Sequence, residues 1–399
     1  MSRRLLPVAV LVALVAALTA SSSPAAPRQR PRAPSGLAFY RPPARLLAGR
    51  HGSVIWSRPA RGTLRLAGAK RALVVLYRSR SLTGTPIAVS GTVWVPKGRP
   101  PKRGWPIISW AHGTTGVGDP CAPSRDSPTS LAHGYIDYVY PELSAWLKAG
   151  YAVIQTDYQG LGTAGPHPYL IGVSEGRGVD DIVRAARELV PALGRRFAIA
   201  GHSQGGQASL FAASIARGWV PELKLVGDAS YAPASHIADQ IKLVGAFTAP
   251  SPISALGAEV LYGAAAGSPA VSISALMAPP ALALMPQLEV KCEPQLIQPD
   301  SFGGLAPNRL LASGANLGPL LALTGRQNPA VSIPVPILLA QGGADATVPK
   351  PFTDQLAGEL RAKHDRLDYR VYPGITHGQI PAAAQPVFMR WVAQRFGRR

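Results

Sequence analysis

The chain has 399 residues, of which 47% are hydrophobic and 16% are charged, and its formal net charge is +20. This length is enough for one large α/β domain with an insertion, or for two domains, and no internal repeat is visible. The charge is uneven, because residues 1–118 hold 19 Lys and Arg residues and neither Asp nor Glu. A basic third of this kind can lie on an anionic envelope polymer or lipid surface, or can simply solvate one face of the protein. A nucleic-acid partner is disfavoured, since no binding module is recognisable.

The first 26 residues have the three-part pattern of a secretory signal peptide. Residues 1–4 are basic, residues 5–20 are apolar, and residues 21–26 are small, which predicts cleavage near residues 20–26. The apolar run is short for a membrane span, and no later stretch qualifies as one. A lipoprotein would need a cysteine near the cleavage point, and there is none. We therefore expect a secreted, extracellular protein.

The next segment, residues 27–56, is rich in Pro and Arg, and we expect a mostly irregular arm. After it, apolar and β-branched runs alternate with helical patterns, which indicates an α/β fold with a mainly parallel sheet covered on both faces. Predicted strands span residues 71–79, 85–96, 105–111, 151–156, 197–200, 223–230, 335–341 and 367–372, and predicted helices span residues 140–147, 179–190, 208–217, 351–363 and 383–396.

The alternation is interrupted over residues 235–327, which are rich in Ala, Leu, Pro and Gly and carry few charges. This composition predicts several short helices, inserted between two parts of the core at residues 57–234 and 328–399. Apolar helices of this kind suit a cap, or lid, over an apolar pocket. The alternative is an ordinary helical subdomain that only packs.

The sequence Gly-His-Ser-Gln-Gly at residues 201–205 follows a short apolar run and precedes a helical segment. This is the strand-turn-helix setting of a nucleophile elbow. The turn is too tight for side chains on either flank, so both flanking residues are Gly, and Ser203 is presented at its crest. The amide of the next residue, Gln204, then points where the oxyanion of a tetrahedral intermediate would form. We predict that Ser203 is a catalytic nucleophile.

A second copy of the pattern, Gly-Val-Ser-Glu-Gly, occupies residues 172–176. No buried strand precedes it, and an amphipathic run follows at residues 179–190. We therefore predict that Ser174 is the N-cap of that helix and has no catalytic role.

A serine nucleophile needs a base to remove its proton and a carboxylate to orient that base. Asp345 is the sole acid in the glycine-rich segment after the strand predicted at residues 335–341. His377 lies among turn residues between the last predicted strand and the last helix, whereas His364 lies in a charged helix end and is expected to be solvated. The predicted triad is Ser203, Asp345 and His377, in the chain order that accompanies a nucleophile elbow.

The second oxyanion donor is expected in the segment His-Gly-Thr-Thr-Gly at residues 112–116, which ends an early predicted strand. The amide of Thr114 is the first candidate and that of Thr115 the next. His112 and His202 are expected to be structural. The other histidines show no ligand spacing, so we expect no catalytic metal.

Cys121 and Cys292 are the only two cysteines. In an exported protein an isolated pair forms a disulfide more often than a metal site or a redox pair. Such a bridge would close a loop of about 170 residues and constrain the unfolded chain. Two free, buried thiols are the alternative.

Taken in order, the motifs resemble the secretory lipase family of α/β-hydrolases, which are secreted lipases and esterases with a helical cap. The resemblance runs from about Ser57 to the C-terminus, although the arginine-rich N-terminus departs from the family pattern. It is carried by the segments at residues 110–116, 157–162, 201–206, 343–345 and 374–378.

This resemblance implies an α/β-hydrolase fold and the cleavage of carboxylic esters, including acylglycerols, through an acyl-enzyme without a cofactor. It also implies that Ser203, Asp345 and His377 form the triad, and that a disulfide similar to Cys121–Cys292 reaches from the oxyanion loop into the cap. The apolar cap favours acyl chains over small polar esters. An acyltransferase of envelope lipids or an exported serine peptidase would use the same triad, and a basic, envelope-bound protein on an inactive hydrolase fold is the non-enzymatic alternative.

Overall fold

The computed structural model describes residues 32–398, so the leader expected at residues 1–26 lies outside it. Nine strands of the described chain form one sheet in the order β1-β2-β3-β5-β4-β6-β7-β8-β9. The pairs β1–β2, β2–β3 and β3–β5 are antiparallel, and the pairs from β5–β4 to β8–β9 are parallel. The strands span Val54–Pro59 (β1), Ala69–Arg80 (β2), Pro86–Pro96 (β3), Trp105–Ala111 (β4), Ala152–Thr156 (β5), Leu193–His202 (β6), Lys224–Tyr231 (β7), Ile337–Gly342 (β8) and Leu367–Tyr372 (β9).

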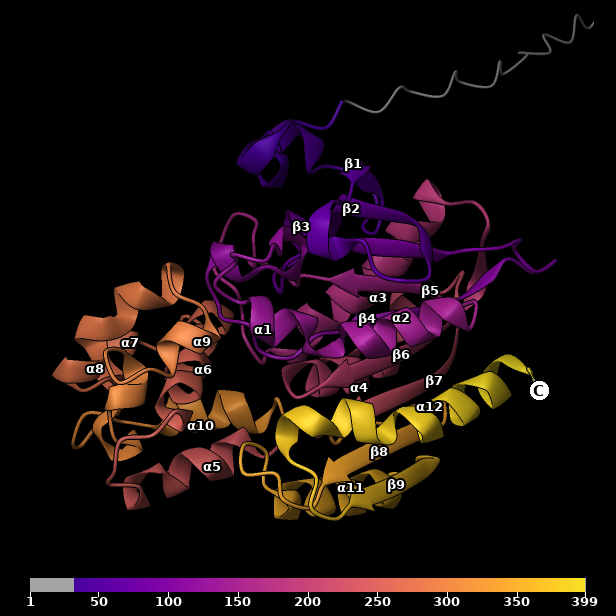
Figure 1. Cartoon of the computed structure of the whole chain (residues 1–399). Coiled ribbons are helices and arrows are strands. Elements are labelled where there is room, and N and C mark those ends of the chain that lie inside the picture. Colours follow the sequence, from indigo (N-terminus) through magenta and orange to yellow (C-terminus); the bar gives the residue numbers. More distant parts are fainter. Residues whose placement is uncertain (1–31, 399) are drawn as a thin grey trace, which may run out of the picture. The chain divides into compact units, whose positions relative to one another are not determined.

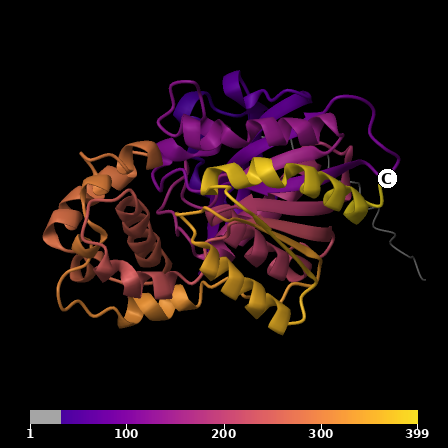
Figure 2. The same ribbon diagram turned by 60° about the horizontal axis from the view of Figure 1, so that its bottom comes forward.

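Helices cover both faces of this sheet (Figures 1 and 2), with α2 and α12 on one face and α3, α4 and α11 on the other. Successive residues of a strand therefore enter opposite cores, as Ile107 and Ile108 of β4 do. A strand buried on both faces needs apolar residues at nearly every position, and β4 and β8 have this composition. The five helices span Tyr140–Lys148 (α2), Gly172–Leu189 (α3), Gln204–Trp219 (α4), Lys350–Ala362 (α11) and Ile380–Phe396 (α12).

Helix α3 begins seven residues before the predicted helix at residues 179–190. The prediction that Ser174 is its N-cap is therefore wrong, because Ser174 is the third residue of the helix and Ile171 holds the cap position. The Ser174 hydroxyl instead donates a hydrogen bond of 2.8 Å to Gln159 Oε1. The early turns of α3 were missed because glycine has a low helix propensity and two glycines lie among its first five residues.

Those glycines allow α3 and α4 to pack very closely. A Cβ atom added at Gly172 would lie 2.0 Å from the Phe211 ring, and one added at Gly176 would lie 2.8 Å from the backbone of α4. Glycine is thus needed for packing at these positions, and burial of the helix offsets the propensity cost. This contact sets the position of the helix that follows Ser203.

The segment between β7 and β8 is helical and builds a hydrophobic core of its own, which includes Ala258, Leu276 and Phe302. Figure 1 shows it in salmon and orange beside the sheet. No helix within residues 32–398 is long and apolar enough to cross a membrane. The helices of this segment are Ile237–Leu243 (α5), Ile253–Gly267 (α6), Ile273–Leu276 (α7), Pro279–Leu284 (α8), Glu293–Leu296 (α9) and Gly318–Gly325 (α10), and a short helix, His133–Ile136 (α1), lies earlier in the chain.

The described part of the N-terminal arm contains short 3₁₀ helices at Gly36–Tyr40 and Ala44–Leu46. Phe39 is fully buried, and its carbonyl oxygen accepts a hydrogen bond of 2.9 Å from Trp56 Nε1. Strand β1 starts at Val54 and so crosses the expected boundary between the arm at residues 27–56 and the core. The end of the arm therefore belongs to the sheet.

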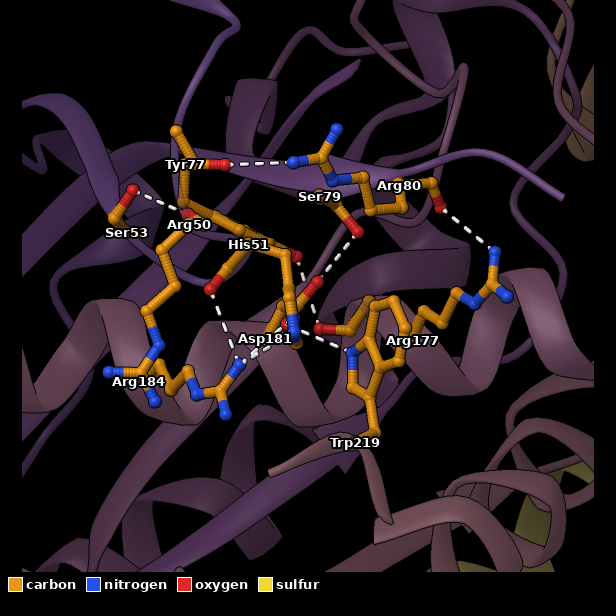
Figure 3. Close-up of polar contacts among 12 residues, drawn as sticks. Arg50, His51, Ser53, Tyr77, Ser79, Arg80, Arg177, Asp181, Arg184 and Trp219 are labelled. Atoms are coloured by element: carbon orange, nitrogen blue, oxygen red, sulfur yellow. Dashed lines mark hydrogen bonds and ion pairs between the residues drawn. The ribbon is translucent and has the colours of Figure 1, made fainter. Parts of the chain in front are cut away.

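A buried carboxylate fixes the chain just before β1 (Figure 3). Asp181 of α3 is fully buried and lies 2.5 Å from His51 Nδ1. Its oxygens also accept hydrogen bonds of 2.7 Å from the Ser79 hydroxyl and 3.0 Å from Trp219 Nε1. A buried carboxylate with three donors is well compensated, so this cluster holds together the arm, β2, α3 and the end of α4.

Candidate active site

Ser203 occupies a sharp turn between the end of β6 and the start of α4. Its backbone has φ 59° and ψ −118°, a conformation that a residue with a side chain rarely adopts and that costs on the order of 1–3 kcal/mol. A Cβ atom added at Gly201 would lie 2.0 Å from the carbonyl oxygen of Gly205, and one added at Gly205 would lie 2.0 Å from that of Ala111. The two flanking glycines are therefore sterically required, as the elbow prediction assumed.

The strained turn is held by backbone hydrogen bonds. The Ser203 amide donates to the Tyr231 carbonyl at the end of β7, over 2.9 Å. The Ser203 carbonyl accepts from the amides of Gln207 and Ala234, each at 3.1 Å. Ser203 itself is half-buried. These bonds explain how the fold keeps a costly conformation at this one residue.

Asp345 and His377 lie side by side although 32 residues separate them. Asp345 follows β8, and its Oδ2 atom lies 2.8 Å from His377 Nδ1. Its Oδ1 atom accepts hydrogen bonds from the amides of Thr347, at 2.9 Å, and Val348, at 2.8 Å. The buried carboxylate is thus fixed as an acceptor, so a neutral imidazole in this place carries its hydrogen on Nδ1 and presents Nε2 as an acceptor.

The residue before Ser203 connects this pair to the elbow. His202 Nε2 lies 3.0 Å from the His377 carbonyl oxygen, and the two rings are 4.5 Å apart. On its other side, His202 Nδ1 lies 2.6 Å from the Tyr138 hydroxyl. Burial, and then the nearby His377, hold the pKa of His202 well below its usual value, so His202 is neutral. His202 therefore has the structural place that was expected of it, and Tyr138 is a support that the sequence analysis missed.

The loop after β4 lies against the elbow. A Cβ atom added at Gly113 would lie 3.3 Å from the His202 carbonyl oxygen. Thr114 is half-buried, and its hydroxyl lies 2.7 Å from the Tyr169 hydroxyl. Thr115 is fully buried, with its carbonyl oxygen bound to the amide of Glu293 at 3.0 Å. The loop that holds both candidate amides for the second oxyanion donor, those of Thr114 and Thr115, thus lies beside the elbow. The amide of Thr114 remains the preferred candidate.

The other predicted donor, the amide of Gln204, is in the first residue of α4. The first four amides of an α-helix have no partner within the helix, and they lie at the positive end of its dipole. An amide at this position is available to an anion.

His112 is the first residue of the loop after β4. Burial lowers its pKa to about 4, which agrees with the structural role expected for that residue.

Cys121 and Cys292 form a disulfide, as predicted, with their Cα atoms 5.5 Å apart. One cysteine follows the loop at residues 112–116, and the other immediately precedes α9 of the helical segment. Together with the bond between Thr115 and Glu293, the disulfide ties the loop beside Ser203 to that segment.

An apolar cavity of about 370 Å³ opens beside Ser203. This volume is in the range of small-molecule sites, which bury most of a ligand against apolar side chains. Within the described chain, no group of three or more His, Cys, Asp or Glu side chains is arranged to hold a metal ion. Apolar residues that line the cavity include Leu243, Val244, Phe247, Ile253, Leu256 and Val260 from the helical segment, and Val348 and Phe352 from the chain after β8.

Comparison with known proteins agrees with this architecture. The family model described as "Secretory lipase" matches residues 132–272. The chain resembles the secretory lipases. The matched stretch contains the elbow at residues 201–205 but neither Asp345 nor His377, so the two later members of the predicted triad depend on the geometry described above.

Two curated relatives are similar to this chain over about half of its length. "Lipase A" of Moesziomyces aphidis is 28% identical over 220 residues, which cover 53% of this chain and 44% of the relative. "Probable inactive lipase MT1628" of Mycobacterium tuberculosis is 29% identical over 204 residues, which cover 50% of this chain and 45% of the relative. The chain thus matches less than half the length of each relative.

Solved structures match over more of the chain. Candida antarctica lipase A in its closed state has a TM-score of 0.78 at 21% identity, covering 92% of this chain and 87% of that chain. The rice cell wall degrading esterase LipA from Xanthomonas oryzae has a TM-score of 0.69 at 19% identity, covering 84% of this chain and 95% of that chain. These likenesses confirm the predicted α/β-hydrolase fold.

Proposed function

We propose that this protein is a carboxylic ester hydrolase with Ser203 as nucleophile, His377 as general base and Asp345 as the acid that orients the base. The observation that carries the proposal is the strained, half-buried Ser203 in the wall of an apolar cavity, at a turn whose preceding residue contacts His377. The 2.8 Å pair of Asp345 and His377 supports the assigned roles.

In the proposed reaction, His377 Nε2 removes the proton of the Ser203 hydroxyl as the oxygen attacks the ester carbonyl carbon. The negative charge on the carbonyl oxygen is stabilised by the amides of Gln204 and Thr114. Collapse of this intermediate expels the alcohol, which takes the proton from His377, and leaves an acyl-enzyme. His377 then deprotonates a water molecule, which releases the carboxylic acid and restores Ser203.

The proposed substrates are esters with an apolar acyl chain, such as acylglycerols. The cavity beside Ser203 is lined mainly by Leu, Ile, Val and Phe side chains, which would bury an acyl chain at about 25 cal/mol per Å² of apolar surface. Most of these side chains come from the segment between β7 and β8, so we propose that this segment acts as the cap of the acyl site. The "Secretory lipase" description and the disulfide support action outside the cytoplasm.

We further propose that the basic surface holds the protein on an anionic lipid or envelope polymer. Lys97, Arg99, Lys102 and Arg103 are all exposed in the turn between β3 and β4. This turn lies at the amino ends of the parallel strands, whereas Ser203 lies at a carboxyl end. An anchored protein would therefore keep its cavity free. Cosedimentation with anionic vesicles that weakens steeply between 50 and 200 mM salt, and fails with zwitterionic vesicles, would support this anchor.

Hydrolysis of p-nitrophenyl esters of increasing acyl length tests the main proposal. We expect turnover to rise with chain length, to be lost in Ser203→Ala, and to persist in Ser174→Ala, which alters the serine of the second Gly-x-Ser-x-Gly motif. A fluorophosphonate probe should label wild type and not Ser203→Ala. Cleavage of aminoacyl amides in preference to esters would indicate a peptidase, and ester products formed with an added alcohol would indicate acyl transfer. A wild-type protein that is not labelled by the fluorophosphonate probe and does not hydrolyse the p-nitrophenyl esters would contradict the proposal.

A further inference from the structure

The side chain of Gln204, next to the proposed nucleophile, is buried in a polar cluster behind the elbow. Gln204 is 1% exposed. Its Nε2 atom lies 2.8 Å from Glu175 Oε1 and 2.9 Å from His167 Nε2, and both of these residues are 0% exposed. Glu175 belongs to the second Gly-x-Ser-x-Gly motif, at residues 172–176, for which the proposed reaction has no use.

The hydrogen positions in this cluster follow from its contacts. His167 Nδ1 lies 2.8 Å from the Gln159 carbonyl oxygen, so Nδ1 carries the hydrogen and Nε2 is an acceptor. Glu175 Oε1 also accepts from the Leu170 amide, at 3.0 Å. The two hydrogens of the Gln204 amide group therefore have one acceptor each. Burial lowers the pKa of His167 to about 4 and raises that of Glu175 to about 8, so the cluster is uncharged at neutral pH.

The same stretch of chain also contacts the loop that holds the second predicted oxyanion donor. The Tyr169 hydroxyl lies 2.7 Å from the Thr114 hydroxyl. Leu170 has a positive φ of 56°, and its carbonyl oxygen accepts a hydrogen bond of 3.3 Å from Gln207 Nε2 of α4. The stretch at residues 167–175 is thus hydrogen-bonded both to the loop that holds Thr114 and to the first turn of α4.

We propose that His167, Tyr169 and Glu175 position the two oxyanion donors of the hydrolase proposed above. Glu175 and His167 hold the Gln204 side chain, and with it the first residue of α4, while Tyr169 holds Thr114. All three are positioning residues, since they act through Gln204 and Thr114. The proposal rests on the proposed function, because oxyanion alignment matters only if Ser203 attacks a carbonyl group. A misplacement of about 1 Å can cost a factor of about 10² in rate.

The test compares Glu175→Gln with Glu175→Met. Gln keeps an oxygen that accepts from Gln204 and Leu170, and it places its NH₂ group where Glu175 Oε2 has no hydrogen-bond partner among the described residues. The Met side chain has a similar volume, but its sulfur atom is only a weak hydrogen-bond acceptor. Ser174→Ala is the control on the same helix, because the Ser174 hydroxyl bonds to Gln159 and not to Gln204.

For Glu175→Met we expect kcat for a p-nitrophenyl ester to fall about 10- to 100-fold with KM within about 2-fold, because one oxyanion donor is worth about 10²–10³ in kcat. Its affinity for a trifluoromethyl ketone, whose adduct carries an oxyanion, should weaken by the same factor as kcat. Glu175→Gln and Ser174→Ala should stay within about 3-fold of wild type in all three measurements.

Three outcomes would overturn the proposal. The first is a Glu175→Met variant with wild-type kcat. The second is a Glu175→Met variant whose KM rises as much as its kcat falls, because that pattern indicates general disruption of the site. In either case wild-type turnover would leave the ester hydrolase standing. The third is a wild type without turnover or fluorophosphonate labelling, which would remove the proposed function together with this inference.

Discussion

At the scale of single residues, the site depends on a few conformations that short sequence motifs require. Ser203 has a positive φ because the chain must pass from β6 into α4 within one residue, and Gly201 and Gly205 are there because neighbouring backbone leaves no room for a Cβ atom. The sequence showed these requirements directly. It showed no such signal for Tyr138, His167 or Glu175, since a buried polar side chain in a loop or helix is recognised only from its partners.

Asp345→Asn should lower kcat for a p-nitrophenyl ester by about 10⁴-fold with little change in KM. The amide can donate to His377 Nδ1, so the imidazole would be held with its hydrogen on Nε2 and could not accept the Ser203 proton. Asp354→Asn, which alters a carboxylate of α11 paired with Lys350, is the control and should keep wild-type activity. A loss of less than about 10-fold in Asp345→Asn would argue against the assigned acid.

At the scale of elements, the strands were predicted closely and the helix starts less well. The predicted strands at residues 105–111 and 367–372 coincide with β4 and β9. The start of α3 was missed because its glycines, which look unfavourable in a helix, allow contact with α4. Strand β1 was missed because it follows an arm rich in Pro and Arg and pairs at the antiparallel edge of the sheet.

Gly176→Ala should lower the free energy of unfolding by about 1–3 kcal/mol, because the new methyl group would lie 2.8 Å from the backbone of α4. Gly218→Ala in α4 is the matched control, since a Cβ atom there would meet nothing within 4 Å. That substitution should raise the stability by up to about 1 kcal/mol through helix propensity. Urea denaturation measures both, and equal effects of the two substitutions would contradict the packing argument.

The disulfide belongs to this scale because it joins two elements, the loop after β4 and α9. Replacing both cysteines by Ser should cost about 2–5 kcal/mol of stability, since a loop with a sequence separation of 171 is no longer closed in the unfolded chain. Thermal denaturation of the variant beside wild type, each without reductant, measures the loss. Adding reductant should lower the melting temperature of the wild type and leave that of the variant unchanged. An unchanged melting temperature of the wild type would contradict the stabilising role of the disulfide.

At the scale of the whole molecule, the fold buries several carboxyl groups that an unfolded chain would expose. Burial raises the pKa of Glu175 and of Asp228 to about 8. Between pH 6.5 and 8 the folded protein therefore keeps protons that the unfolded chain has lost, so unfolding releases protons. The free energy of unfolding must then fall as the pH rises through this window.

Asp228→Asn should make that dependence less steep, by at most about 1.4 kcal/mol per pH unit for one proton. Urea denaturation at pH 6.5, 7.25 and 8 measures the slope for wild type and variant. Asp354→Asn is again the control, because Lys350 and Tyr369 donate hydrogen bonds to that carboxylate and its pKa is lowered, so it does not titrate in this window. A slope for Asp228→Asn equal to that of wild type would show that Asp228 does not contribute.

The sequence by itself determined the α/β alternation, the elbow motif at residues 201–205 and the order of the predicted triad, and it favoured a disulfide between the two cysteines that the structure then showed, because each depends on local spacing or on residue counts. Only the tertiary structure decided that Asp345 meets His377, that an apolar cavity opens beside Ser203, and that Glu175 supports Gln204. These are contacts between residues that lie 29 or more positions apart. Which residues meet depends on how the strands and helices pack, and a local sequence pattern carries no information on that packing.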